Sequence, residues 1–464
     1  MDNQETRNLS LDRGQVTLAK TPHLTSSALV DEDYLTGALK IVGLGKGSYG
    51  KINLVRTWDD RIHAVKYMEI PEDGLTNSQL GEANALTRFR NAESMIQLVG
   101  ICYASTRRLA MILEPLDSDL HAFQQKIKFS ERLALLRPLF QSMIKALSLL
   151  EAFNMSHFDI KPENILVKVD GGTTTFKLAD FGFAQIIPIT SLITSDVVYT
   201  RPYRPPEFLC GISEEYLDSG GEITSDIWAL ALVLIEFITG QVVFPAEDDA
   251  KVKLLTGQTS FTAASLILKH LPSELFDEID RDLVDIITRM LSLKPEERPT
   301  ASKLLATFSQ ETSSELFQRF SSPLYPRVYH DRQVPLLIKI GTQARMSKAC
   351  IIIAIELFTR YLALVPDLSD VFIVLCLTIA SDFFEKSYTT MDDFISHYRI
   401  IVNKALSPPA QHYIQAQRKI LLDLNFEIYD THLTEVIQRA YNDNIDISTI
   451  DPITFSQPVT DWLK

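Results

Sequence analysis

The sequence has few cysteines, a deficit of basic charge and no long apolar run, and each shortage excludes a class of protein. Its four cysteines stand far apart without a Cys-x-x-Cys pair, which argues against a disulfide framework or a zinc site and favours an intracellular chain. Lys and Arg number 45 against 59 Asp and Glu, so the net charge of -14 disfavours nucleic acid as a partner. The most apolar runs, 351–355 and 371–380, are shorter than the roughly 18 residues that cross a bilayer, so no membrane partner is expected.

What is present is enough chain for several compact units, since 464 residues correspond to about three domains of roughly 150 residues each. We expect a soluble monomer. Composition and hydrophobic periodicity divide the sequence into a flexible polar arm (1–36), a small sheet with one helix (37–117), a mostly helical region (118–308), a Ser- and Pro-bearing linker (309–330), an apolar all-helical unit (331–436) and a polar tail (437–464). The run Asp170-Gly171-Gly172 predicts a hairpin inside the third segment.

Several short motifs carry the chemistry. Residues 45–50 read GKGSYG, where missing side chains would let backbone N–H groups approach phosphates, although an ordinary glycine turn is the favoured explanation of this run taken alone. Lys66 ends a short apolar strand and by itself fits a solvated lysine. The order and spacing of further motifs decide against both ordinary explanations: HFDIKPEN at 157–164, DFG at 180–182, PPE at 205–207, DIW at 226–228 and Arg298-Pro299.

With these motifs, residues 38–308 resemble a eukaryotic serine/threonine protein kinase. The resemblance implies an α+β fold of two lobes, 37–117 and 118–308, that binds ATP and Mg²⁺ and phosphorylates Ser or Thr of protein substrates. Asp159 would accept or orient the proton of the substrate hydroxyl, and Lys161 would steady the transferred group. Asp180 and Asn164 would hold the metal.

The resemblance also implies a nucleotide site. Lys66 would hold the α- and β-phosphates and pair with a helix carboxylate, for which Glu82 is the choice because Leu86 and Phe89 follow it at helical spacing. Leu113 would stand at the back of the adenine pocket. The other residues expected around the nucleotide are Leu44, Gly45, Gly47, Gly50, Ile52, Ala64, Glu114, Leu116 and Leu166.

Two further matches imply structural roles. Glu207 and Arg298 would form a buried ion pair that anchors the segment after the DFG motif, and Asp226 would hold the catalytic loop from a buried helix. Breaking either contact would lower activity by misplacing the reacting groups.

The branch of the family is indicated by two segments. Residues 72–82 resemble the helix by which cyclin-dependent kinases dock cyclin, with Leu80 where that family has an isoleucine, and TRPYR at 200–204 resembles a run in cyclin-dependent and mitogen-activated kinases. The C-terminal unit resembles a cyclin box, although each of its apolar stripes also fits a generic bundle. The matching runs are 353–362, 373–385 and 420–430.

Some positions depart from the cyclin-dependent pattern. Gly81, Phe158 and Gln185 stand where that family collects a loop phosphate on three arginines. A phosphate orders a loop by pairing with arginine, so we predict that the loop holding Ser195 is ordered without phosphorylation. In the cyclin-like unit the family's Lys–Glu pair is Asp382 and Gln417, and we predict that Asp382 meets a cation such as Arg418.

Four other residues bear on regulation and substrate choice. Ser48 and Tyr49 match a pair that inhibitory kinases modify in this family, and they equally fit plain loop residues. Tyr199 replaces a small aliphatic residue of proline-directed relatives, which leaves a preference for Ser/Thr-Pro open, and Phe183 favours serine over threonine by resemblance.

Together these resemblances predict a kinase fused to its own activator, in which the cyclin-like unit docks near Leu80 and holds Glu82 against Lys66. Two alternatives stay open. The helical unit is a module that recruits another protein, or the whole chain is a catalytically silent scaffold. The second alternative is the weaker one, because the expected metal and base positions are all filled.

Overall fold

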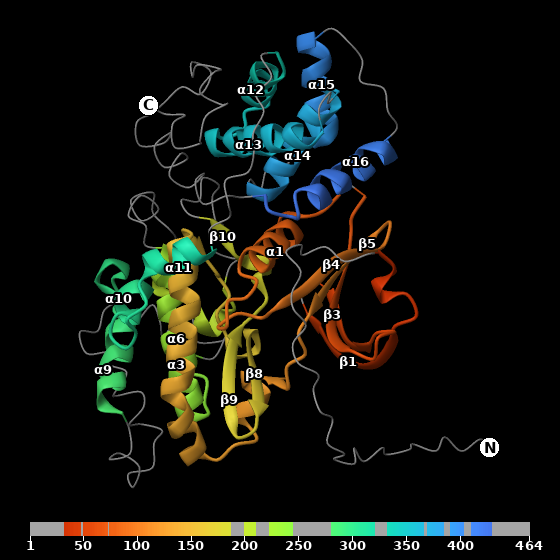
Figure 1. Ribbon diagram of the computed structural model, residues 1–464. Helices are drawn as coiled ribbons and strands as arrows, with labels where there is room; N and C mark the ends of the chain where they lie inside the picture. The colour runs from red at the N-terminus through yellow and green to blue at the C-terminus, as the bar shows by residue number, and fades with distance from the viewer. Residues whose placement is uncertain are drawn as a thin grey trace, which may run out of the picture.

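The computed structural model describes residues 32–47, 50–72, 74–186, 199–209, 222–244, 280–320, 332–365, 369–384, 390–402 and 410–428. These residues form an N-terminal lobe, a larger second lobe and a helical bundle that lies against the N-terminal lobe (Figure 1). The predictions for Ser48, Tyr49 and Ser195 lie outside the described residues, as do those for 1–31 and 429–464.

The N-terminal lobe is built on an antiparallel sheet with apolar side chains on both faces. On β3, Val65 belongs to one apolar cluster with Ala110 and Ile112, while Ala64 and Met68 belong to the other, as expected from the two-residue period of a strand. The strand order is β1-β2-β3-β5-β4, with β1 Leu39–Gly47, β2 Gly50–Arg56, β3 Ile62–Glu69, β4 Leu98–Ser105 and β5 Arg108–Leu113.

One helix, α1 (Asn77–Arg88), completes this lobe where the sequence predicts it. Thr76 and Gln79 form a capping box that starts the helix, and the Gln79 side chain donates to the Glu69 carbonyl at 2.7 Å, which ties the helix to β3. The helix packs on η3 (Phe181–Phe183) and on a helix of the bundle, α14 (Val371–Phe384). Helix α1 therefore contacts both the second lobe and the bundle.

The second lobe is mainly helical. The predicted hairpin is confirmed: β8 (Ile165–Asp170) pairs with β9 (Thr173–Leu178), and its turn residues Gly171 and Gly172 have φ of 54° and 86°. Helix α3 (Phe129–Ala152) packs against β9, α6 (Glu222–Thr239) and α10 (Ala301–Leu305). Among the described residues, α3 alone has the length and apolar composition to cross a membrane, and its packing inside this lobe accounts for that composition.

The shorter elements of this lobe carry and connect the site residues. They are β6 (Ser118–Asp119), α2 (Leu120–Gln124), β7 (Met155–Ser156), η2 (Pro162–Asn164), β10 (Gln185–Ile186), η4 (Arg201–Tyr203), α4 (Pro206–Leu209), α9 (Arg281–Met290) and η6 (Pro295–Glu297).

Helix α11 (Ser313–Phe320) corrects the linker predicted over 309–330. Thr312 and Glu315 cap its first turn with hydrogen bonds of 2.7 and 3.2 Å, and Leu316 is buried as the helix packs on α3. Because α11 is amphipathic and buries its apolar side chain against α3, it is part of the second lobe. The crossing to the bundle therefore lies after residue 320, outside the described residues.

The bundle surrounds α14, whose contacts with all four neighbouring helices explain why it is apolar on every side. Gly341 allows a close helix approach, because a Cβ there would lie 2.9 Å from Ile351 and 3.2 Å from Leu377. The neighbours of α14 are α12 (Gln333–Gln343), α13 (Lys348–Leu364), α15 (Met391–Val402) and α16 (Ala410–Asp423).

The bundle contacts the N-terminal lobe through polar groups as well as through α14. The backbone N–H of Ile428 donates to Asn84 Oδ1 on α1 at 3.0 Å, and this contact is buried. The Arg418 guanidinium lies 3.8 Å from the ring centroid of Tyr103 on β4. Leu80 is fully buried. Figure 1 shows α14 and α16 lying over α1.

Of the two residues that the predicted cyclin resemblance singles out, Gln417 lies on this side of the bundle. Gln417 is buried beside the loop before α1, since a Cβ added at Gly74 would lie 2.7 Å from Gln417 Oε1. The contact between Asp382 and Arg418 stays a prediction.

Candidate functional site

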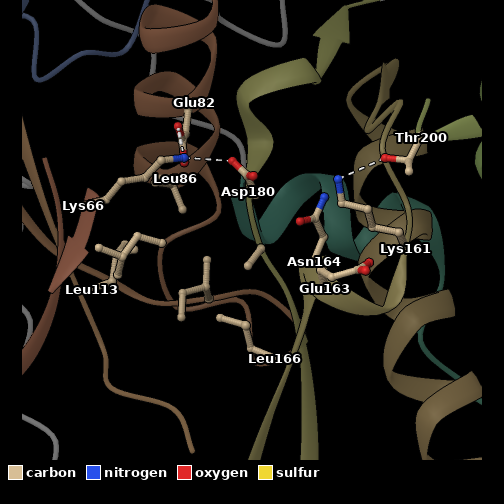
Figure 2. A pocket seen from close by; sticks show the side chains of 13 residues that line it. Lys66, Glu82, Leu86, Leu113, Lys161, Glu163, Asn164, Leu166, Asp180 and Thr200 are labelled. Atoms are coloured by element: carbon tan, nitrogen blue, oxygen red, sulfur yellow. Dashed lines mark hydrogen bonds and ion pairs between the residues drawn. The ribbon is translucent and has the colours of Figure 1, made fainter. Parts of the chain in front are cut away.

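Three charged side chains meet between the lobes. Lys66 Nζ donates to the two carboxylate oxygens of Glu82 at 2.6 and 2.8 Å and to Asp180 Oδ1 at 2.8 Å (Figure 2). Sheet register positions the lysine, because Lys66 pairs with β2 and β5 neighbours in the middle of the sheet. The pairing of Lys66 with Glu82 is the one that the helical spacing of α1 predicts.

Burial and pairing oppose each other in this group. Burial alone would lower the pKa of Lys66, but the carboxylates of Glu82 and Asp180 outweigh it and raise that pKa. Burial alone would raise the pKa of Asp180, and the Lys66 ammonium instead lowers it. Complete burial raises the pKa of Glu82 against the pull of the same ammonium. Lys66 is therefore a protonated cation that two carboxylates hold in place.

The backbone at Asp180 aims its carboxylate into the site. Asp180 has φ of 62°, in the left-handed region that most residues avoid. The next side chain, Phe181, is fully buried between Phe89 of the N-terminal lobe and His157, with ring centroids 6.4 and 5.3 Å away. Because Phe181 occupies this apolar position, Asp180 turns the other way, toward Lys66.

Asp159 is the centre of a second group. Its Oδ1 accepts from the hydroxyl of Thr200 at 2.7 Å, and its Oδ2 accepts from the Asn164 amide at 2.9 Å. Lys161 Nζ lies 2.6 Å from Asp159 Oδ2 and donates to Thr200 Oγ1 at 3.0 Å. Both carboxylate oxygens are thus oriented by donors, which fixes the direction in which Asp159 can accept a proton.

The predicted structural residues hold this group from behind. Asp226 on α6 accepts from the backbone N–H groups of His157 and Phe158 at 2.6 and 3.0 Å, and burial raises its pKa. Glu207 and Arg298 form the predicted ion pair, with two parallel contacts of 2.7 Å in a buried setting. Both contacts are confirmed.

A cavity of about 500 Å³ joins the two charged groups, and its size suits a ligand such as a nucleotide. Figure 2 shows Lys66, Asp180, Asn164 and Lys161 around it. The residues that line it are Ile52, Lys66, Glu82, Leu86, Ile96, Leu113, Lys161, Glu163, Asn164, Leu166, Ala179, Asp180 and Thr200.

Other residues expected around a nucleotide are not among those that line the cavity, and they lie in the strands beside it. Ala64 pairs directly with Leu113 across β3 and β5, which places it beside the lining. Leu44 is about half exposed on β1. Gly50 is required by packing, because a Cβ there would lie 2.3 Å from the Tyr67 carbonyl oxygen. Gly45 and Gly47 lie in β1.

In the segment 114–116, which is expected to face the adenine base, some polar groups are already hydrogen-bonded within the protein. The Glu114 carboxylate accepts from Lys177 at 2.6 Å and from the Gln97 backbone at 2.8 Å, while the Glu114 N–H donates to the Gln97 carbonyl at 3.0 Å. Leu116 is partly buried against the core. Among these groups, the Glu114 carbonyl is the one that we expect to face a ligand.

Sequence reasoning missed several lining residues. Thr200 belongs to the TRPYR run, and its hydroxyl is the signal in the sequence that could indicate a contact with Asp159. Ala179 directly precedes Asp180, so its place in the lining follows from the DFG motif. Nothing in the local pattern singles out Ile96, whose N–H donates to the Leu178 carbonyl at 2.9 Å.

The donor set suits Mg²⁺ and a polyphosphate. Asp180 supplies a carboxylate, and the Asn164 amide donates its nitrogen to Asp159, which leaves the amide oxygen as a possible ligand. Both side chains line the cavity beside the Lys66 ammonium (Figure 2). Hard oxygen donors next to a buried cation are the groups that a metal–phosphate complex needs.

Comparisons with known proteins agree with this chemistry. The family model described as Protein kinase domain matches residues 39–308. Cyclin-dependent kinase-like 2 of Rattus norvegicus is 33% identical over 213 residues, which cover 44% of this chain and 39% of that protein. The Homo sapiens protein of the same name is 27% identical over 333 residues, covering 66% of this chain and 64% of that protein.

A third relative is mitogen-activated protein kinase 8 of Oryza sativa subsp. japonica, which is 27% identical over 293 residues, 57% of this chain and 50% of that protein. The chain spans between 35% and 64% of the length of the first curated relatives that it matches. The bundle lies beyond the end of the family match at residue 308.

Proposed function

Because the chain belongs to the protein kinase family, we propose that it transfers the γ-phosphate of ATP to serine or threonine hydroxyls of proteins. The observation that carries this proposal is one cavity lined both by the Lys66–Glu82–Asp180 group and by the side chains that orient Asp159. A lysine two residues after the proposed base favours the serine/threonine class by resemblance.

In the proposed reaction the protein positions groups and balances charge. Lys66, held by Glu82, contacts the α- and β-phosphates, and Asp159 accepts the proton of the attacking hydroxyl. Lys161 lies 2.6 Å from Asp159, where its charge offsets the negative charge that builds up during transfer. Bound Mg²⁺, held by Asp180 and Asn164, would neutralise the phosphates.

An Asp159→Asn variant tests the activity. We expect loss of phosphoryl transfer to a generic protein substrate, with nucleotide binding retained because Asp159 is absent from the cavity lining. Lys168→Gln is a matched control, since Lys168 lies on β8 in an exposed ion pair with Asp117. A wild-type chain that binds ATP but phosphorylates nothing in a peptide library supports the silent scaffold instead.

We further propose that the bundle is a cyclin-like domain that activates the kinase in cis. Support comes from α1, which packs both on η3 and on α14. A helix that contacts both elements is held in the position that keeps Glu82 within 2.6 Å of Lys66. Tethering adds an effective concentration on the order of mM, so a weak contact suffices.

Deleting residues 321–464 tests activation in cis. The proposal expects a large loss of transfer, whereas a bundle that only recruits other proteins leaves phosphorylation of a generic peptide unchanged. Leu80→Arg serves as a second variant, because a charge at this fully buried position opposes docking. Adding a separate cyclin tests an intermolecular arrangement, which would be favoured if activity rose.

We also propose a preference for substrates with proline after the phosphorylated residue. Tyr199 turns its side chain inward and is buried, and its carbonyl accepts from Arg204 at 3.1 Å. A carbonyl that already accepts from a guanidinium is a weaker acceptor for the N–H of the residue that follows the target hydroxyl, so a proline there loses little. Matched Ser-Pro and Ser-Ala peptides test this preference, and equal kcat/KM for the two contradicts it.

A further inference from the structure

Two residues with left-handed backbone flank the contact between Asp159 and Thr200. Phe158, directly before Asp159, has φ of 60°, and Tyr199, directly before Thr200, has φ of 62°. Bulky residues adopt this conformation only where the surroundings impose it, and such strain gathers at functional sites. The surrounding contacts must therefore hold both residues in this conformation.

The surroundings of both residues are shared. The Tyr199 N–H donates to the Phe158 carbonyl at 2.9 Å. Their rings meet edge to face at 5.7 Å, and Phe208 on α4 contacts both rings, at 6.1 Å from Phe158 and 5.2 Å from Tyr199. All three rings are buried, so this aromatic cluster of Phe158, Tyr199 and Phe208 is packed as a unit.

One carboxylate oxygen closes the arrangement. Asp226 Oδ1 accepts from the Tyr199 hydroxyl at 3.1 Å and from the Phe158 N–H at 3.0 Å. The same aspartate thus ties the residue before the base to the residue before Thr200. Asp159 directly follows Phe158, and Thr200 directly follows Tyr199. The Thr200 hydroxyl donates to Asp159 Oδ1 at 2.7 Å.

We propose that Tyr199 is a positioning residue for phosphoryl transfer, which sets Thr200 against Asp159 through the aromatic cluster and through Asp226. The proposal rests on the proposed kinase activity. The charged groups in this arrangement are the carboxylates of Asp226 and Asp159 and the Arg204 guanidinium, which donates to the Tyr199 carbonyl. None of these contacts includes a phosphate. Phe158 then has a role of its own, as the ring on which Tyr199 rests.

Tyr199→Phe in the full chain tests the proposal, since it removes only the hydroxyl. We expect kcat to fall roughly fivefold, the effect of one lost hydrogen bond, while KM for ATP stays unchanged because Tyr199 lies outside the cavity lining. Phe208→Leu removes ring contacts and should lower kcat in the same way without touching Asp226.

Tyr398→Phe is the matched control, because Tyr398 is a buried tyrosine of the bundle whose hydroxyl donates to Asp370 at 2.8 Å. A fall in kcat for Tyr199→Phe that exceeds the control, at equal thermal midpoint, supports positioning. The proposal is overturned if both variants lose the same thermal stability and keep the wild-type kcat. A wild-type chain without transfer refutes the proposed function itself, which is a separate result.

Discussion

The hydrogen bond from Ile428 to Asn84 offers a direct way to perturb the contact between the bundle and α1. Asn84→Ala removes the acceptor from a buried N–H at an interface where both partners are covered. Leaving a buried donor unsatisfied costs about 1–3 kcal/mol. The docking equilibrium should therefore weaken by roughly 5- to 150-fold, because each 1.4 kcal/mol is about a factor of ten.

Such a shift changes the activity only if the effective concentration of the tethered bundle does not greatly exceed the dissociation constant of its contact with α1. With an effective concentration of order mM, a tethered contact with a dissociation constant of about 10 μM is docked about 99% of the time. A tenfold weakening then leaves about 90% docked and changes the rate little. Hydrogen exchange of the α1 amides measures the opening equilibrium itself and is the sharper assay.

We expect the exchange of α1 amides to accelerate in Asn84→Ala by a factor within the range calculated above, with the change confined to α1 and its contacts. Asn77→Ala is the control, because Asn77 is the first residue of the same helix and is only partly buried. Unchanged protection of α1 in Asn84→Ala, or equal effects of both variants, would refute the reasoning.

Three further outcomes are expected. Arg298→Ala strands Glu207 in a buried setting and should lower the free energy of unfolding by about 3–5 kcal/mol in denaturant titrations. Lys66→Met leaves Glu82 buried without its cation, so the folded pKa of Glu82, which burial already raises, rises further above the unfolded value. The variant should therefore lose more thermal stability at about pH 8 than at about pH 5. Phosphatase treatment or Ser195→Ala should leave activity unchanged, and a tenfold loss would contradict phosphate-independent ordering.

The charged groups of the site could be predicted because the order and spacing of the motifs resemble a known family, and local helical spacing then selected one helix carboxylate. The period of α1 sets Glu82 in line with Leu86, so the choice of Glu82 as the partner of Lys66 follows from helix geometry. The hairpin of β8 and β9 follows in the same way from two adjacent glycines.

Features that depend on distant contacts could not be found in this way. The Thr200–Asp159 contact joins two loops, and its polar partners become evident only once the chain is folded. Helix α11 was missed for a different reason: Thr312 and Glu315 form a capping box that the sequence does display, but the serines and prolines around it favoured a linker. In this segment the capping chemistry of Thr312 and Glu315 outweighs the local composition.

The position of Ile428 also has a consequence for synthesis on the ribosome. The bond between Asn84 and Ile428 joins residues 344 positions apart, so α1 emerges long before its outer partner exists. At ordinary rates of translation that interval lasts roughly 20 to 70 s. In the proposed arrangement a nascent or prematurely terminated chain lacks the element that completes α1. The order of synthesis would then keep the proposed kinase inactive until residue 428 has been made.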